Sequence, residues 1–293
     1  MDTTLSILIP TFNSDCTELV NSLHQEAMAT TGLRYEIVVA EDGSTDPALI
    51  SLNHTIATLP DVRHIIREKN VGRSAIRNFL AREAQYPHLL FIDSHMSVIR
   101  PDFLRTYLSH IDEPLVYGGY IIPSDVVVPE GNLRYLYEQS CAEILSHANR
   151  QQSPYANFHT SNFMISRDLM LTYPLDERFK RYGYEDVLWG KTLQEAGVGI
   201  HHISNPLGFS RFEDNARYME KTDEGLQTLH EFRDELQGYS RLLGVARKLR
   251  VLKMPLRWFH ALFGSMMRKQ LTGPHPSLWI FKVYRLTYYF SLT

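Results

Sequence analysis

The chain has 293 residues, of which 44% are hydrophobic and 22% are charged, and its formal net charge is −3. This length and apolar content suffice for one large folded domain with an appendage and argue against a disordered chain. Cys16 and Cys141 lie far apart without CxxC spacing, so the sequence supports neither a disulfide framework nor a zinc ribbon and fits a reducing cytoplasm.

Apolar runs that predict strands alternate with helical patterns in the first third of the chain. The runs are LSILIPTF at 5–12, YEIVVAED at 35–42, VRHIIR at 62–67 and HLLFID at 88–93, and helical patterns cover about 16–30 and 72–84. Strands joined by helices form right-handed crossovers, which place the strands parallel in one sheet with helices on both faces. The fold class that we predict is α/β, with a mostly parallel central sheet.

Polar residues stand at the end of each of these runs or directly after it. They are Thr11 and Asn13, Glu41 and Asp42, residues 68–70, and Asp93 and His95. Ligands of open α/β sheets bind at the carboxyl ends of the strands, so we expect one crevice lined by all four ends. Asp93 and His95 are two residues apart and point the same way on an extended chain, as ligands of a metal or nucleotide would. A polar turn after a core strand is the alternative.

Two nucleotide-binding signatures are absent. No GxGxxG follows the first strand and no GxxxxGK[ST] occurs, which argues against a dinucleotide-dependent dehydrogenase and a P-loop enzyme.

Three later segments predict further elements. VYGGYIIPSD at 116–125 predicts a strand, and 132–150 predicts one helix with an apolar face. Glu185 and Asp186 open a short helix that Gly197 ends. Acidic residues in a first helical turn interact favourably with the helix dipole, but an aspartate that starts a helix beside a cleft can also act as a general base.

Seven motifs stand in the order found in a known enzyme family. They are SILIPTFN, EIVVAEDGSTD, EKNVGRSAIRNFLA, LLFIDSH, SNFMISRDLM, FKRYGYEDVLWGKTLQEAG and NPLGFSRFEDNARYMEKT. Over about residues 5–230 the chain resembles family 2 glycosyltransferases of the GT-A fold, especially those of bacterial polysaccharide and lipopolysaccharide clusters. The resemblance implies a Rossmann-like GT-A domain, which we place at 1–235, and the change to a basic composition after Glu235 predicts a separate helical tail at 236–293.

The resemblance also implies the reaction. It is the inverting transfer of a hexosyl or N-acetylhexosaminyl group from a nucleotide-diphospho-sugar, with a UDP-sugar favoured, to a hydroxyl of a glycan or lipid-linked acceptor in cell-surface polysaccharide synthesis. A catalytically weak sugar-nucleotide-binding or scaffold protein of the same fold is the alternative. A nucleotidyltransferase shares the sheet topology, but its glycine-rich, basic amino-terminal loop is missing after LSILIP.

Donor-binding residues follow from the resemblance. It assigns the base and ribose to Pro10, Thr11, Phe12, Asn13 and Asp42, with Glu41 beside them, and the nucleotide sugar to Asp93 and Ser94. Arg73 and Arg77 lie on the GRSAIRN helix, where guanidinium groups can pair with the diphosphate. Arg77 in a structural ion pair is an equal alternative.

The metal site departs from the family pattern. Asp-Ser-His stands where the family usually has DxD, so the implied ligands are Asp93 and His95. Because imidazole favours later transition metals, we expect Mn²⁺ rather than Mg²⁺. Phe209 occupies the position of a further family ligand and cannot bind metal. His201 or His202 could replace it, and a cation-independent enzyme with arginines at the diphosphate stays open.

Asp186 is the expected general base, because its motif matches the family's catalytic segment. Glu185 would orient or bind the acceptor, and His159, Ser161 and Asn162 would line the sugar or acceptor pocket. Helix capping by Asp186, and a turn followed by a strand at 159–162, are the alternatives.

The end of the chain is basic and amphipathic. After Glu235 it has ten lysines and arginines and no acidic residue. Apolar side chains recur every three or four residues, at Leu242, Val245, Leu249, Leu252, Leu256, Phe259, Phe263 and Met267. Pro255 is expected to separate two helices.

Such a tail fits the interface of an anionic membrane. We therefore expect peripheral contact through 238–293 at the inner face of the cytoplasmic membrane, with packing on the main domain or contact with another protein as the alternatives. The acidic main body argues against nucleic acid as a partner. No secretory signal and no membrane-spanning stretch is recognised in the sequence.

Overall fold

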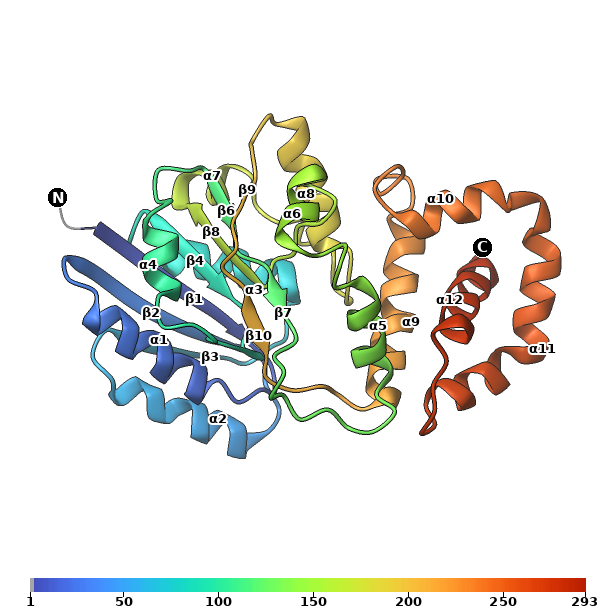
Figure 1. Cartoon of the computed structure of the whole chain (residues 1–293), viewed down its shortest axis with the longest axis horizontal. Coiled ribbons are helices and arrows are strands. Elements are labelled where there is room, and N and C mark those ends of the chain that lie inside the picture. Colours follow the sequence, from blue (N-terminus) through green and yellow to red (C-terminus); the bar gives the residue numbers. More distant parts are fainter. Residues whose placement is uncertain (1–2) are drawn as a thin grey trace.

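A seven-stranded mixed sheet forms the centre of the protein in a computed structural model that describes residues 3–293 (Figure 1). Its strand order is β3-β2-β1-β4-β8-β6-β9. The predicted strands β1 (Thr3–Thr11), β2 (Leu33–Asp42), β3 (Val62–Arg67) and β4 (His88–Ile92) are mutually parallel. Strand β8 (Asn162–Ser166) runs antiparallel to β4 and to β6 (Leu115–Tyr117), and β9 (His201–His202) pairs with β6. The predicted α/β fold is confirmed.

Helices cover both faces of this sheet (Figure 1). The helices of the described residues are α1 (Thr17–Ala29), α2 (Pro47–His54), α3 (Arg73–Glu83), α4 (Phe103–Leu108), α5 (Leu133–Cys141), α6 (His147–Gln152), α7 (Arg167–Thr172), α8 (Glu185–Glu195), α9 (Asn215–Glu231), α10 (Arg241–Lys248), α11 (Lys253–Leu271) and α12 (Leu278–Leu292). Of these, α9 to α12 lie together beyond the sheet (Figure 1). Short 3-10 turns occupy Thr55–Thr58 and Arg250–Leu252.

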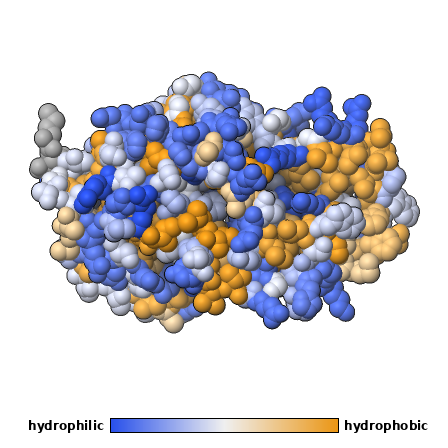
Figure 2. All heavy atoms as spheres, in the orientation of Figure 1, coloured by the Kyte–Doolittle hydropathy of each residue, from blue (hydrophilic) through white to orange (hydrophobic). Residues whose placement is uncertain are grey.

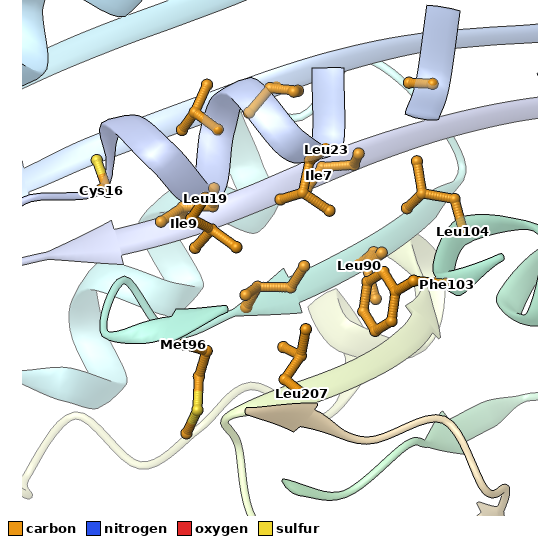
Figure 3. Packing of buried hydrophobic residues seen from close by; sticks show 14 of the residues in the cluster. Ile7, Ile9, Cys16, Leu19, Leu23, Leu90, Met96, Phe103, Leu104 and Leu207 are labelled. Atoms are coloured by element: carbon orange, nitrogen blue, oxygen red, sulfur yellow. The ribbon is translucent and has the colours of Figure 1, made fainter. Parts of the chain in front are cut away.

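The continuous apolar run of β1 is explained by burial on both faces, as is usual for a central parallel strand. Ile7 and Ile9 pack against Leu19 and Leu23 of α1 (Figure 3). Leu8 points to the opposite face, in the cluster that includes α3. Because side chains alternate along β1, each face of the strand packs against a helix. The carboxyl end of β1 remains open beside the carboxyl ends of its neighbouring strands.

A second, three-stranded sheet lies beside the carboxyl end of β4. It consists of β5 (Met96–Ser97), β10 (Leu207–Phe209) and β7 (Tyr120–Ile121), in the order β5-β10-β7. Phe209 pairs with Met96, which brings the NPLGF motif against the DSH motif. Two segments that are distant in the sequence thus lie side by side at the carboxyl end of β4.

The predicted strand at 116–125 is wrong, because it divides between the two sheets at Gly118 and Gly119. The Arg150 guanidinium fills the space beside this break and donates to the carbonyls of Gly118 and Ile203 at 3.1 and 2.9 Å. A Cβ atom on Gly119, whose φ is 82°, would lie 1.6 Å from Arg150 Nη1. The single helix predicted at 132–150 is also divided, since α6 is a separate turn that brings Arg150 into the interior.

The carboxyl-terminal helices pack on the rest of the protein. Figure 1 shows α12 between α9 and α11, and α12 also contacts α5 and α10. One cluster joins Leu226 and Leu229 of α9 to Tyr289 and Phe290 of α12. A second buries Phe281; its members are Leu133, Met219, Met267, Leu271, Phe281 and Tyr284. The proposed boundary after Glu235 falls in the turns between α9 and α10, and these shared clusters cross it.

Pro255 does not separate two helices, contrary to the prediction. It lies in the first turn of α11, where its missing N–H has no helical partner to lose. The break precedes it, at 249–252. Among the described residues, no helix has the length and apolar content to cross a membrane.

Phe281→Ala should lower the free energy of unfolding by about 3–5 kcal/mol, because it empties a buried aromatic position. Trp279→Ala, an exposed aromatic of the same helix, is the matched control and should change it by about 0.5 kcal/mol or less. Urea unfolding followed by circular dichroism measures both. A Phe281→Ala protein that unfolds in a separate early step, with the main transition unchanged, would show that the tail folds independently.

Candidate active site

A cleft of about 2090 Å³ opens at the carboxyl ends of the strands. The structure brings most of the predicted site residues to its walls. They are Pro10, Thr11, Phe12, Asn13, Asp42, Arg73, Arg77, Asp93, Ser94, His95, His159, Ser161 and Asp186. Glu41, Asn162 and Glu185 are not among the lining residues.

The loop after β1 is held against the loop after β2. Asn13 adopts a left-handed conformation with φ of 47°, and its Oδ1 atom accepts from the amides of Thr45 and Asp46 at 2.8 and 3.2 Å. Phe12 is 43% exposed at the cleft. Asn13 therefore shapes the loop that presents an aromatic ring.

Asp42 connects the end of β2 to the start of α3. Its two carboxylate oxygens accept from the amides of Val71 and Gly72 at 2.9 and 3.0 Å. Burial raises the pKa of Asp42 above its ordinary value, against the lowering effect of these amides. A carboxylate oxygen has two lone-pair directions, so Asp42 retains acceptor capacity toward the cleft.

Glu41 faces a different environment from Asp42. Its carboxylate accepts from Asn53 Nδ2 at 2.8 Å, lies 3.3 Å from His64 Nε2 and also accepts from Ser44 Oγ. Burial alone would raise the pKa of Glu41, but these hydrogen bonds, His64 first, hold it below its usual range. The predicted place of Glu41 beside the nucleoside is not what the structure shows, because its oxygens are occupied beneath the loop.

A buried ion network joins three segments at the centre of the cleft. Arg77, 2% exposed, donates to Asp93 and to the Arg73 carbonyl. Arg73 donates to Glu185 Oε1 at 2.5 Å and to Asp93 Oδ2 at 3.4 Å. Burial opposes ionisation of Asp93, but Arg77 and then Arg73 lower its pKa below the usual value. Removing one partner of such a pair costs about 3–5 kcal/mol, because the other charge stays buried.

The two arginines differ in what they can bind. The Arg77 guanidinium is enclosed, which favours a structural ion pair over contact with a diphosphate. The Arg73 side chain is 36% exposed. Arg73 is therefore the guanidinium of this pair that a cleft ligand can reach.

His95 and Asp93 offer two donors for a metal ion. Burial is the main reason that the pKa of His95 falls to about 4, so its imidazole is neutral and can ligate at neutral pH. The resemblance placed Phe209 at the position of a further metal ligand, and the centroid of its ring lies 5.8 Å from that of the His95 ring. A phenylalanine ring provides no metal ligand. His201 and His202 do not line the cleft, so neither replaces it.

No group of three His, Cys, Asp or Glu side chains suited to a metal ion occurs within residues 3–293. Divalent cations at phosphates are nevertheless often held by one or two protein ligands, with the substrate and water completing the shell. One ionised carboxylate and one neutral imidazole fit that arrangement.

Asp186 is oriented by two contacts at the start of α8. Its Oδ2 atom lies 2.9 Å from His159 Nδ1, and its Oδ1 atom accepts from the Val187 amide at 2.8 Å. Burial raises the pKa of Asp186, but the hydrogen bond and charge of His159 hold it below its ordinary value. For His159, burial acts downward and the Asp186 carboxylate raises the pKa above 6.5. The pair is thus a carboxylate held at the cleft wall by the His159 ring.

The remaining predicted residues, Asn162 and Ser161, have different surroundings. Asn162 is fully buried, donating to the carbonyls of Gly119 and Asn205 at 2.7 and 3.0 Å and accepting from Tyr107 at 2.7 Å. It therefore holds the β6–β7 break and does not line a pocket. Ser161 does line the cleft, and its hydroxyl has no protein partner.

Sequence reasoning missed a second cationic group that lines the cleft. Arg134 of α5 donates to Glu213 at 2.7 Å, and Lys221 of α9 pairs with the same carboxylate. Both cations line the cleft and lower the pKa of His95. Glu213 and Lys221 belong to the last family motif, which was the available signal. No sequence motif indicated Arg134, because its place in the cleft depends on how α5 packs.

The geometry has a counterpart among known families. Residues 6–172, more than half of the chain, match the family model described as Glycosyl transferase family 2. The chain belongs to glycosyltransferase family 2. Its fold is that of the GT-A glycosyltransferases.

Sequence relatives of this glycosyltransferase are similar over part of their length. The poly(ribitol-phosphate) beta-N-acetylglucosaminyltransferase TarS of Staphylococcus aureus is 31% identical over 110 residues, which are 37% of this chain and 19% of TarS. The chondroitin synthase of Pasteurella multocida is 25% identical over 242 residues, which are 70% of this chain and 24% of the synthase. The chain thus spans less than two thirds of the curated relatives it matches.

Solved structures share the fold of this glycosyltransferase. The crystal structure of S. aureus TarS 1–349 in complex with UDP matches with a TM-score of 0.53 and 18% identity, covering 98% of this chain and 89% of that chain. Glucosyl-3-phosphoglycerate synthase from Mycobacterium tuberculosis, crystallised with Mn²⁺, UDP and its product, matches with a TM-score of 0.51 and 15% identity over 80% of each chain.

His159→Leu should move the acidic limb of the pH–rate profile of this glycosyltransferase to higher pH. A lowered pKa keeps Asp186 deprotonated, and able to accept a proton, down to low pH. Without the His159 ring the lowering by its hydrogen bond and charge is lost, so Asp186 protonates at higher pH. The pH dependence of kcat/KM measures the shift, with the exposed His201→Leu as control. An unchanged acidic limb in His159→Leu would contradict the pairing.

Proposed function

We propose that the chain transfers a sugar from a UDP-sugar to a hydroxyl of a glycan or lipid-linked acceptor, with inversion at the anomeric carbon. The observation that carries the proposal is that Asp42, Asp93 and Asp186 line one cleft. Crystal structures of TarS, which has the same fold, contain UDP and UDP-GlcNAc. We place the reaction in cell-surface polysaccharide synthesis at the inner face of the cytoplasmic membrane.

The donor would lie along the strand ends. Phe12 and Asp42 provide an aromatic surface and a hydrogen-bond acceptor, as a nucleobase and ribose require. The diphosphate would lie between Arg73 on one wall and Arg134 and Lys221 on the other. All three cations line the cleft, and guanidinium groups bind phosphate oxygens in a fork.

Asp186 would act as the general base. It accepts the proton of the acceptor hydroxyl while that oxygen forms a bond to the anomeric carbon. The bond from that carbon to the β-phosphate oxygen breaks, and its electron pair leaves with the nucleoside diphosphate. His159 holds the carboxylate toward the acceptor, and Glu185, bound to Arg73, fixes the start of α8. Glu185 would therefore orient the base and not itself receive the proton.

A divalent cation would be held by Asp93 and His95 and would neutralise charge on the diphosphate. The imidazole ligand favours Mn²⁺ over Mg²⁺. The cations Arg73, Arg134 and Lys221 share this role, because they stabilise the negative charge that develops on the leaving group.

Phe209 favours one other function, because it removes a metal ligand that the family pattern supplies. A sugar-nucleotide-binding protein without transferase activity would keep the cleft and the arginines but would not depend on Asp186. The two functions therefore predict different results for nucleotide release by the Asp186→Asn variant.

Asp186→Asn should lower nucleotide release from the preferred donor by about 10²–10⁴-fold, because it removes the general base. Nucleotide binding, read as an increase in Tm across a panel of UDP- and GDP-sugars with and without Mn²⁺, should be unchanged. Asp168→Asn is the matched control, since Asp168 also lies in a first helical turn but outside the cleft.

Two results would count against this function. Equal release by Asp186→Asn and Asp168→Asn would remove Asp186 as the base. Selective binding of a UDP-sugar without release by the unmodified protein, across glycan and lipid-linked acceptors, would favour the binding protein.

A further inference from the structure

The outer face of α11 carries a row of exposed apolar side chains. Met254, Trp258, Leu262 and Met266 recur every fourth residue and are 55%, 65%, 70% and 62% exposed. Trp279, at the start of α12, is 72% exposed. We call these five residues the α11 face. Within residues 3–293 nothing covers it, and Figure 2 shows apolar surface gathered over the carboxyl-terminal helices.

The α11 face differs from the apolar face predicted from the sequence. Met267, which the periodicity assigned to a membrane-facing side, is 6% exposed and lies in the cluster with Leu133 and Phe281. Leu256 packs against the neighbouring cluster. Leu256 and Met267 of the predicted side therefore hold α11 on the protein, whereas Phe259 and Phe263 of that side are 39% and 40% exposed. The α11 face is an adjacent side of the same helix that is left without a partner among the described residues. A helix that is apolar on two sides has more apolar surface than its own fold uses.

The segment that carries the α11 face is basic. Exposed cations follow one another from α10 to α12, namely Arg247, Lys248, Arg250, Arg257, Lys269 and Lys282. No acidic residue occurs after Glu235. A second copy of the chain is a poor occupant, because a symmetric contact would bring these like charges together. Anionic lipid headgroups have the complementary charge, and tryptophans are suited to the interfacial region between headgroups and acyl chains.

We propose that the α11 face docks on the surface of an anionic lipid bilayer, with its apolar side chains in the interface and the surrounding cations on the headgroups. The face lies on the membrane and does not cross it, as expected for an amphipathic helix with a basic rim.

The same segment also reaches the active-site cleft. Arg241, Leu242 and Gly244 of α10 and Arg285 of α12 line its wall. A bilayer beneath α11 would hold this end of the cleft near the membrane, where a lipid-linked hydroxyl can approach Asp186. This second step rests on the proposed function, whereas the docking itself does not.

Vesicle flotation tests the docking with a matched pair of variants. Met266→Glu places a charge in the α11 face, and Met28→Glu places the same charge on α1, at a methionine that is 66% exposed. On phosphatidylcholine vesicles with phosphatidylglycerol, Met266→Glu should bind at least about tenfold more weakly than the unmodified chain. Met28→Glu should bind as the unmodified chain does. Binding should also fall when phosphatidylglycerol is omitted and when salt is raised.

Solution measurements keep the outcome interpretable. Both variants should release nucleotide from a UDP-sugar at the same rate without vesicles, which shows that they are folded, and Leu262→Glu should repeat the result of Met266→Glu. Equal vesicle binding by Met266→Glu and Met28→Glu, or binding that ignores phosphatidylglycerol, would overturn the proposal. A dimer in vesicle-free solution that Met266→Glu alone dissociates would also overturn it, since the face would then be occupied by a second copy. Nucleotide release that persists when docking fails separates this failure from failure of the proposed function.

Discussion

The Arg73 guanidinium joins the two halves of the active site. It contacts Asp93, just after β4, and Glu185, at the start of α8. Arg77 lies beneath it, paired with Asp93. Buried charges are tolerated only with partners, so each of these four side chains requires the others. Because Asp186 follows Glu185 directly, this network also helps to fix the position of Asp186 in the cleft.

Elements governed by local pattern were predictable from the sequence, and contacts between distant segments were not. The continuous apolar runs of β1 and β2 predicted a parallel sheet, and the polar residues after them predicted the cleft. Glu41 and Asp42 are neighbours with the same local pattern, yet Asn53 and His64 bury the carboxylate of the first. Arg150 interrupts a strand some thirty residues earlier in the chain. The pairing of His159 with Asp186 likewise depends on the folded arrangement.

Different sides of the carboxyl-terminal helices have different surroundings. One side joins α9 and α5 in shared clusters, another lines the cleft, and a third remains apolar and exposed within a basic rim. Helical periodicity detects that a helix is amphipathic, but it does not assign each apolar side to the protein or to another surface. The packing of Met267 and the exposure of Met266 make that assignment.

A crystal structure of the Asp186→Asn variant with an intact UDP-sugar would test the central claim most directly, namely that one cleft holds the donor and the base on opposite sides of the anomeric carbon. We expect the uracil near Asp42, the diphosphate between Arg73 and Arg134, and the anomeric carbon facing residue 186 with room for an acceptor oxygen between them. A donor whose anomeric carbon points away from residue 186, or whose diphosphate lies apart from Arg73, would contradict the account.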